Sequence, residues 1–203
     1  MLIKTAHQRY VSIHRANAIA AHLATLLPRN LRILDIGCGD GFLARLLLDR
    51  RPDLDVVGID VLQRYETQIP VEVFDGKEIP FADRSFDCSM LIDVLHHTLT
   101  VRELLQEAIR VSKHSVVIKD HTAAGVFDRR ILTFMDSVGN KRFGVPLPNN
   151  YLSRETWDKL FAELKLKPVE TRTQLHLYPW FADWVFGRSL HFLTLLTVPS
   201  GDA

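Results

Sequence analysis

The sequence predicts an α/β fold: a doubly wound, mostly parallel sheet with an antiparallel pair of strands at its C-terminal edge. Short apolar segments alternate with longer amphipathic segments over the first two thirds of the chain. Helical crossovers of this length join parallel strands and cover both faces of a sheet. After Lys165 two extended segments, at about 168–177 and 190–198, follow one another without a helix-length crossover, and this change predicts the antiparallel pair.

The first half of the chain supplies two helices and four strands. Apolar residues recur at helical spacing over residues 7–27, where Pro28 ends the predicted helix, and again over 42–48. Short apolar segments predict strands at residues 31–36, 55–59, 71–74 and 86–92. The second and third of these strands each lead into a carboxylate, Asp60 and Asp75.

The second half begins with a helix and a fifth strand. Thr100 and Glu103 form a T-x-x-E capping box, which predicts a helix that begins at Val101. The segment 115–119 is short and mostly apolar, so we expect it to be the fifth strand. Apolar residues at helical spacing predict two further helices, over about 127–138 and from the capping residue Ser153 to Leu164.

The composition excludes several classes of protein. Lys and Arg together number 25 and Asp and Glu 24, so the formal charge of +1 argues against a partner held mainly by phosphate charge, such as a nucleic acid. Two cysteines, Cys38 and Cys88, are too few for a disulfide framework and fit a reducing, cytoplasmic location. No uncharged apolar run approaches the roughly 18 residues of a membrane-spanning helix, so we expect no membrane span.

The turn after the first strand, residues 37–41, predicts a ligand site. Its glycines let a strand turn sharply into a helix while the backbone closely approaches a ligand. The dinucleotide fingerprint GxGxxG needs a glycine where Phe42 stands, and the third glycine is instead Gly41, which weakens an NAD-binding interpretation. Asp60 follows Gly41 by 19 residues, a position where a carboxylate accepts hydrogen bonds from two ribose hydroxyls.

The segment 34–44, LDIGCGDGFLA, resembles the first motif of the class I S-adenosylmethionine-dependent methyltransferases, in particular the type 11 small-molecule branch. The segment 58–60, GID, is similar to the ribose-binding acid of that superfamily, and 74–97 to its adenine-binding acid and fourth strand. The resemblance covers about residues 31–120 and implies a Rossmann-like fold with S-adenosyl-L-methionine as cofactor. One departure is that only residues 61–70 separate the second and third strands, so the usual helix there must be very short or absent.

The resemblance also implies which residues bind the cofactor. Asp35 and the backbone of Gly37 and Gly39 would face the methionine moiety. Asp60 would bind the ribose hydroxyls, and Asp75 the adenine amino group, although Asp75 also fits a turn or a cap. The full set of predicted cofactor-binding residues is Asp35, Gly37, Gly39, Gly41, Asp60, Val61, Phe74, Asp75, Gly76 and, bordering the methionine end, Asp93.

Catalysis of methyl transfer can come largely from alignment, because the reaction is an in-line displacement at a sulfonium. A base becomes useful when a hydroxyl acceptor must lose its proton, and histidine titrates in the suitable range. His97 follows the fourth strand and His121 the fifth, at the edge where open parallel sheets bind ligands, so both are predicted catalytic residues. Both also fit structural roles, and His96 fits one better. No compact metal-binding motif occurs, and we expect no metal site.

Aromatic residues are concentrated between Tyr178 and Phe186, on a segment bounded by Pro179 and Gly187. Either these rings pack into the core, or they form an apolar lid for an aromatic or lipid-like acceptor, together with a long loop at 139–150. Both interpretations remain open from the sequence.

The expected function is that of a cytoplasmic S-adenosylmethionine-dependent methyltransferase whose acceptor is a small, largely apolar or aromatic molecule, with a hydroxyl oxygen favoured. The alternatives are a cofactor-binding module without turnover and, disfavoured by the glycine spacing, a nucleotide-cofactor oxidoreductase. No linker or repeat divides the chain, so one domain is expected over 1–203. Its expected parts are an N-terminal helix at 1–30, a cofactor-binding core at 31–120 and a substrate-side region at 121–203.

Overall fold

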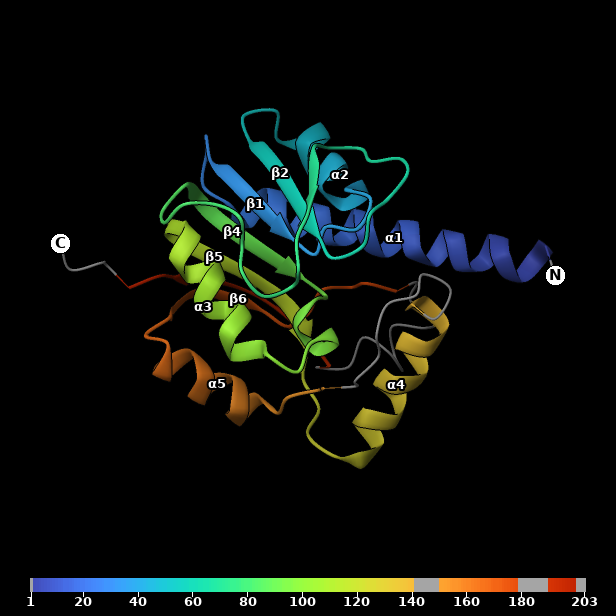
Figure 1. Ribbon diagram of the computed structural model, residues 1–203. Helices are drawn as coiled ribbons and strands as arrows, with labels where there is room; N and C mark the ends of the chain where they lie inside the picture. Colours follow the sequence, from blue (N-terminus) through green and yellow to red (C-terminus); the bar gives the residue numbers. More distant parts are fainter. Residues whose placement is uncertain (1, 141–149, 179–189, 200–203) are drawn as a thin grey trace.

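The computed structural model describes residues 2–140, 150–178 and 190–199, of which 2–9 and 134–140 are described by their backbone alone. Within these residues a seven-stranded sheet runs through the molecule in the order β3-β2-β1-β4-β5-β7-β6 (Figure 1). The strands are β1 Arg32–Ile36, β2 Asp55–Asp60, β3 Val71–Val73, β4 Phe86–Ile92, β5 Ser112–His121, β6 Lys167–Arg172 and β7 His191–Thr197.

The first five strands are parallel, and β7 lies antiparallel between β5 and β6. This arrangement confirms the predicted fold class. Several boundaries differ from the prediction: α1 begins at Leu2, β5 runs from Ser112 to His121, and β6 ends at Arg172. The carboxyl ends of the parallel strands therefore meet at one edge of the sheet, which is where ligands bind in open α/β folds.

Helices cover both faces of the sheet (Figure 1). One face packs against α1 Leu2–Leu26 and α2 Phe42–Arg50, and the other against α3 Val101–Val111 and α5 Arg154–Glu163. The remaining helical elements are α4 Val126–Asn140 and the short 3-10 helix η1 Leu95–His97. Leu23 of α1 and Leu105 of α3 are fully buried, and each such side chain stabilises the fold by about 1.5–3 kcal/mol.

The two predicted caps have different outcomes. Ser153 caps α5 as expected, because its hydroxyl accepts a hydrogen bond from the Thr156 N–H at 3.1 Å. The predicted capping box at Thr100 is wrong, since the Thr100 side chain makes no capping hydrogen bond to α3. Its hydroxyl pairs with that of Thr98 at 2.9 Å instead, and Thr98 also accepts the Thr100 N–H at 3.1 Å.

Between β2 and β3 the chain crosses without a helix, as the short spacing predicts. Residues 61–70 form an irregular loop, and the Gln68 N–H donates to the Asp40 carbonyl at 2.8 Å. This hydrogen bond ties the loop to the glycine turn. Among the described helices, none has the length and apolar character needed to cross a membrane.

Candidate functional site

The glycine turn after β1 has the conformation that its residues require. Gly37, Gly39 and Gly41 have φ angles of +75°, +61° and +77°, a region that other residues rarely adopt. A Cβ on Gly37 would lie 2.6 Å from Val94 Cγ2, whereas a Cβ on Gly39 would meet nothing within 4 Å. Gly37 is therefore required by packing, and Gly39 leaves open space beside the backbone where a ligand can lie.

Asp60 at the end of β2 connects this turn to the following loop. Its Oδ2 accepts the Gly39 N–H at 2.8 Å, and its Oδ1 accepts the Leu62 N–H at 2.8 Å. The residue is 7% exposed. Each carboxylate oxygen retains a second lone pair, so Asp60 can hold the turn and still accept hydrogen bonds from a ligand.

Asp35 lies behind the glycine turn and is almost fully buried. Burial, and after it the nearby charge of Asp60, raises the pKa of Asp35 to about 7. A carboxyl group with such a pKa carries a proton through much of the acidic range. Asp35 therefore lies in the interior, and its side chain does not line the pocket described next.

A pocket of about 540 Å³ opens at the carboxyl edge of the sheet, beside the glycine turn. Of the predicted site residues, those that line it are Gly37, Gly39, Asp60, Val61, Phe74, Gly76, Asp93 and His97. Those that do not line it are Asp35, Gly41, Asp75 and His121. The pocket also includes Arg64 from the loop after β2, which the sequence analysis did not identify.

Asp75 faces solvent and caps its own turn. Its Oδ1 accepts the N–H groups of Lys77 and Glu78, at 2.8 and 3.0 Å, and these hydrogen bonds lower the pKa of Asp75. This geometry matches the alternative role of a turn or cap carboxylate. Its neighbours Phe74 and Gly76 do line the pocket, so contact between Asp75 and an adenine amino group stays a prediction.

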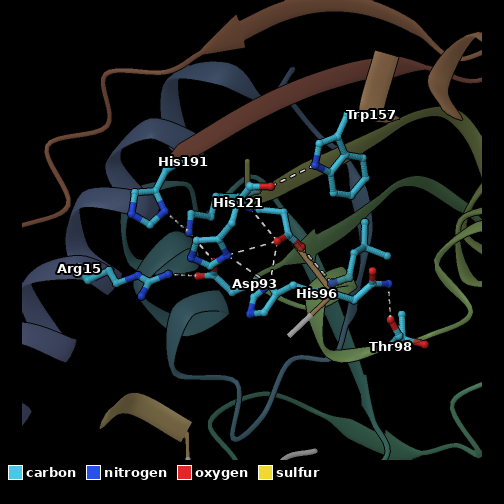
Figure 2. Close-up of polar contacts among 11 residues, drawn as sticks. Arg15, Asp93, His96, Thr98, His121, Trp157 and His191 are labelled. Atoms are coloured by element: carbon cyan, nitrogen blue, oxygen red, sulfur yellow. Dashed lines mark hydrogen bonds and ion pairs between the residues drawn. The ribbon is translucent and has the colours of Figure 1, made fainter. Parts of the chain in front are cut away.

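Charged side chains from separate elements meet around Asp93, which also lines the pocket (Figure 2). We call Arg15, Asp93 and Lys119 the charged end of the pocket. Arg15 of α1 donates from Nη2 to Asp93 Oδ2 at 2.6 Å. The fully buried Lys119 of β5 pairs with Asp93 Oδ1, and its Nζ lies 3.4 Å from His191 Nδ1. Although burial alone would raise the pKa of Asp93, the charges of Arg15 and Lys119 hold it well below its usual range. Asp93 is therefore an anion that faces the pocket with two cations around it.

Asp120 joins β5 to η1 through hydrogen bonds in the protein interior. Its Oδ1 accepts the His121 N–H and lies 2.7 Å from His96 Nδ1. Its Oδ2 accepts the Leu95 N–H at 3.0 Å. Burial would raise the pKa of Asp120, but its contacts with His96 and His121 keep it far below the usual range. The ionised carboxylate thus fixes the short helix that carries His97.

The two predicted catalytic histidines have different positions. His97 lines the pocket, at the end of η1, where its N–H donates to the Val94 carbonyl at 2.9 Å. His121 is buried beneath the pocket wall, and burial lowers its pKa to about 4, so its imidazole is neutral at neutral pH. Trp157 Nε1 donates to the His121 carbonyl at 3.0 Å (Figure 2). His97 is placed to contact a ligand, and His121 to support the residues around it.

Near the charged end of the pocket, three side chains have donor atoms of the kind that can bind a metal ion. Asp93, His96 and His121 each bring one donor atom to within 4.8 Å of the others. However, the two oxygens of Asp93 already pair with Arg15 and Lys119, and His96 Nδ1 is directed at Asp120. We assign this group to the ion-pair network, and the absence of a metal requirement stays a prediction.

The predicted lid falls mostly outside the described residues. This applies to Pro179, the aromatic residues that follow it, and the loop 141–149. Tyr178 is described: it is buried, and its hydroxyl lies 3.5 Å from His191 Nε2. For Tyr178 alone, the structure shows the core packing that was one of the two interpretations.

The chain is similar in sequence to known methyltransferases. Residues 6–171 match a family model described as a methyltransferase domain. A 27-O-demethylrifamycin SV methyltransferase of Amycolatopsis mediterranei is 30% identical over 104 residues, which are 44% of this chain and 38% of the relative. A sarcosine/dimethylglycine N-methyltransferase of Aphanothece halophytica is 30% identical over 98 residues, 42% of this chain and 35% of the relative.

Solved structures share the fold. A SAM-dependent methyltransferase of Aquifex aeolicus superposes with a TM-score of 0.57 and 15% identity, over 85% of each chain. The matches to the two curated relatives span less than two fifths of those proteins' own length.

Proposed function

The chain belongs to the methyltransferase-domain family, and from this premise we propose that it transfers a methyl group from S-adenosylmethionine to a small, largely apolar molecule. We further propose a hydroxyl oxygen as the acceptor atom. The observation that carries the proposal is that the open space at Gly39 and the carboxylate of Asp60 belong to one pocket at the carboxyl edge of the sheet.

Family membership implies S-adenosylmethionine as the cofactor, and the pocket residues fit its chemistry. The methionine moiety would lie along the backbone of Gly37 and Gly39, where Gly39 leaves open space. Asp60 would accept hydrogen bonds from the ribose hydroxyls with the lone pairs that the backbone does not use. The apolar walls at Val61 and Phe74 suit the adenine ring.

When bound, the cofactor supplies an electrophilic methyl group on a sulfonium. The chain aligns the acceptor with that group and excludes water, and alignment of this kind reaches effective molarities of roughly 10⁵ M or more. A hydroxyl acceptor must also lose its proton. Of the two predicted histidines, His97 lines the pocket, so we propose that its imidazole takes this proton while His121 supports the pocket wall.

The proposed acceptor is a separate question from the cofactor. The named relatives include a methyltransferase of 27-O-demethylrifamycin SV and an N-methyltransferase of sarcosine and dimethylglycine, so the family spans different acceptor atoms. The proposal of a small apolar acceptor rests on the aromatic residues of the sequence between Tyr178 and Phe186. A cytoplasmic location and the absence of a nucleic-acid partner remain predictions from the composition.

The direct experiment has two stages. Calorimetry with S-adenosylhomocysteine tests the cofactor, and release of this product during incubation with S-adenosylmethionine and a panel of phenols, alcohols and amines tests turnover. We expect binding, and product release with hydroxyl compounds. Binding without release from any compound would support the alternative of a cofactor-binding module. Binding of NAD(H) with no response to either S-adenosyl compound would favour an oxidoreductase.

A further inference from the structure

Lys119 is a buried cation that the proposed reaction does not use. It stands at the end of β5, and its side chain is fully buried. Removing an ammonium group from water is costly unless strong partners replace the lost hydration. The observed partners are the carboxylate of Asp93 and the ring of His191.

Asp93 is the member of this network that reaches the pocket. Lys119 holds it twice, because the Asp93 N–H donates to the Lys119 carbonyl at 2.8 Å and the Asp93 carboxylate pairs with the Lys119 ammonium group. Arg15 binds the second carboxylate oxygen. The backbone of Asp93 has a φ of +59°, which is uncommon for a residue with a side chain and often marks a functional position. A change in the charge of Lys119 therefore affects the pocket through the position of Asp93.

The groups that face Lys119 from neighbouring elements determine its ionisation. These groups are Arg15 from α1, Asp93 after β4, Asp120 and His121 from β5, and His191 from β7. His96 from η1 contacts His121. Burial, and after it the charge of Arg15, lowers the pKa of Lys119 to about 8. Burial likewise lowers the pKa of His121 and that of His191, so both rings are neutral at neutral pH. Within this network, Lys119 is the group whose charge changes at mildly alkaline pH.

We propose that Lys119 is a positioning residue, whose ammonium group holds the Asp93 carboxylate against the pocket wall so that the cofactor site is complete only while Lys119 is protonated. The inference rests on the proposed function, since it concerns the same pocket. A neutral amine still donates a hydrogen bond to the Asp93 carboxylate, but the attraction between the two opposite charges is lost. Once Lys119 has lost its proton, Arg15 is the one cation that still pairs with Asp93, and the Asp93 side chain is freer to rotate.

Stability alone does not account for the buried pair. Replacing a buried ion pair by apolar groups is often neutral or stabilising, whereas removing one partner leaves an uncompensated charge. Here Arg15 stays beside Asp93 when Lys119 is removed, so that charge is still compensated. Lys119→Met should therefore fold, and its effect should appear in binding.

The test compares Lys119→Met and Lys119→Arg with the unaltered chain, by calorimetry with S-adenosylhomocysteine between pH 6.5 and pH 9.5. The ligand's own amine titrates identically in all samples, so differences between the proteins belong to the chain. The matched control is Lys113→Met, an exposed lysine at the opposite end of β5, which should match the unaltered chain throughout.

Above pH 8 we expect the affinity of the unaltered chain to fall about tenfold further than the affinity of Lys119→Arg, because the arginine side chain stays charged. Lys119→Met should bind about tenfold more weakly at pH 7 and lack the steeper alkaline fall. Identical pH profiles for the unaltered chain and Lys119→Arg would overturn the proposal, and this comparison remains decisive if Lys119→Met fails to fold. If the unaltered chain binds no S-adenosylhomocysteine at any pH, the proposed function fails, and the role of Lys119 fails with it.

Discussion

One part of the pocket, the backbone end, presents mainly backbone groups, and a second part, the charged end, presents charged side chains. The first end is made by the glycine turn at 37–41 and by Asp60, whose carboxylate accepts two backbone N–H groups. The second end is made by Arg15, Asp93 and Lys119, which come from α1, the end of β4 and β5. Recognition by backbone needs few specific side chains, whereas the charged end depends on each of its members.

This difference assigns separate tasks to the two ends. The backbone end has a shape that fits one kind of ligand and is similar to a motif shared across a superfamily. The charged end combines residues that are 104 positions apart in sequence, from Arg15 to Lys119, and its charges can be changed one at a time. Substitutions at the backbone end should alter cofactor affinity or folding. Substitution of the pocket residue His97 should instead alter turnover. The following predictions test this separation.

The largest effect is expected from His97→Gln. If His97 takes the proton of a hydroxyl acceptor, its replacement should lower kcat about 10²-fold, because general-base catalysis typically contributes that much or more. The affinity for S-adenosylhomocysteine should change less than about twofold. Steady-state kinetics and calorimetry give the two values, and His114→Gln, on an exposed residue near the start of β5, is the matched control. Equal losses of binding and rate would instead make His97 a residue that shapes the pocket.

Within the glycine turn, packing and ligand binding can be tested at separate residues. Gly37→Ala should lower the free energy of unfolding by about 2 kcal/mol, because its Cβ would meet Val94 in a left-handed backbone conformation. The added methyl group of Gly39→Ala would meet no neighbour, so this variant should lose only about 1–2 kcal/mol of its free energy of unfolding through conformational strain. The same methyl group should lower the cofactor affinity about tenfold. Urea titrations and calorimetry distinguish the two outcomes. A Gly39→Ala variant with unchanged affinity would remove the open space at Gly39 from the site.

The smallest effect concerns Asp35 and the pH dependence of folding. Burial raises the pKa of Asp35 from 3.8 to about 7, so between these values the folded chain holds a proton that the unfolded chain releases. The resulting stabilisation is fully present below pH 3.8 and is lost as the pH rises through 7. Asparagine cannot ionise, so the stability of Asp35→Asn relative to the unaltered chain should be higher at pH 8 than at pH 5, by about 1 kcal/mol or more. Urea titrations at both pH values check this, and an equal difference at both would contradict the raised pKa.

The backbone end could be predicted from sequence because its determinants are local. Gly37, Gly39 and Gly41 lie next to the strand that they end, and Asp60 ends the neighbouring strand, so spacing alone places them together. The alternation of strands and helices similarly predicts the parallel sheet. The capping box at Thr100 failed because Thr98, two residues earlier, offers the nearer hydrogen-bonding partner.

At the charged end Asp93 was predicted as a pocket residue, but its partners could not be predicted, because no short motif joins them to it. Arg15 is one of several polar residues on a long helix, and His191 begins a strand that could have paired elsewhere. Lys119 did give a signal, since a lysine near the end of an apolar parallel strand such as 115–119 must bury its charge or find a partner. Asp120 and His121 follow directly and share the same signal. Their partners, however, come only from the folded structure.

The central claim is that the pocket beside Asp60 binds the cofactor, and calorimetry of Asp60→Ala with S-adenosylhomocysteine tests it most directly. Loss of charge-assisted hydrogen bonds to the ribose should cost about 1.5–3 kcal/mol, which weakens binding by roughly one to two orders of magnitude. Asp49→Ala, on the exposed face of α2, is the control and should bind as the unaltered chain does. Affinity within about twofold of the unaltered chain, in an Asp60→Ala variant that folds normally, would contradict the claim.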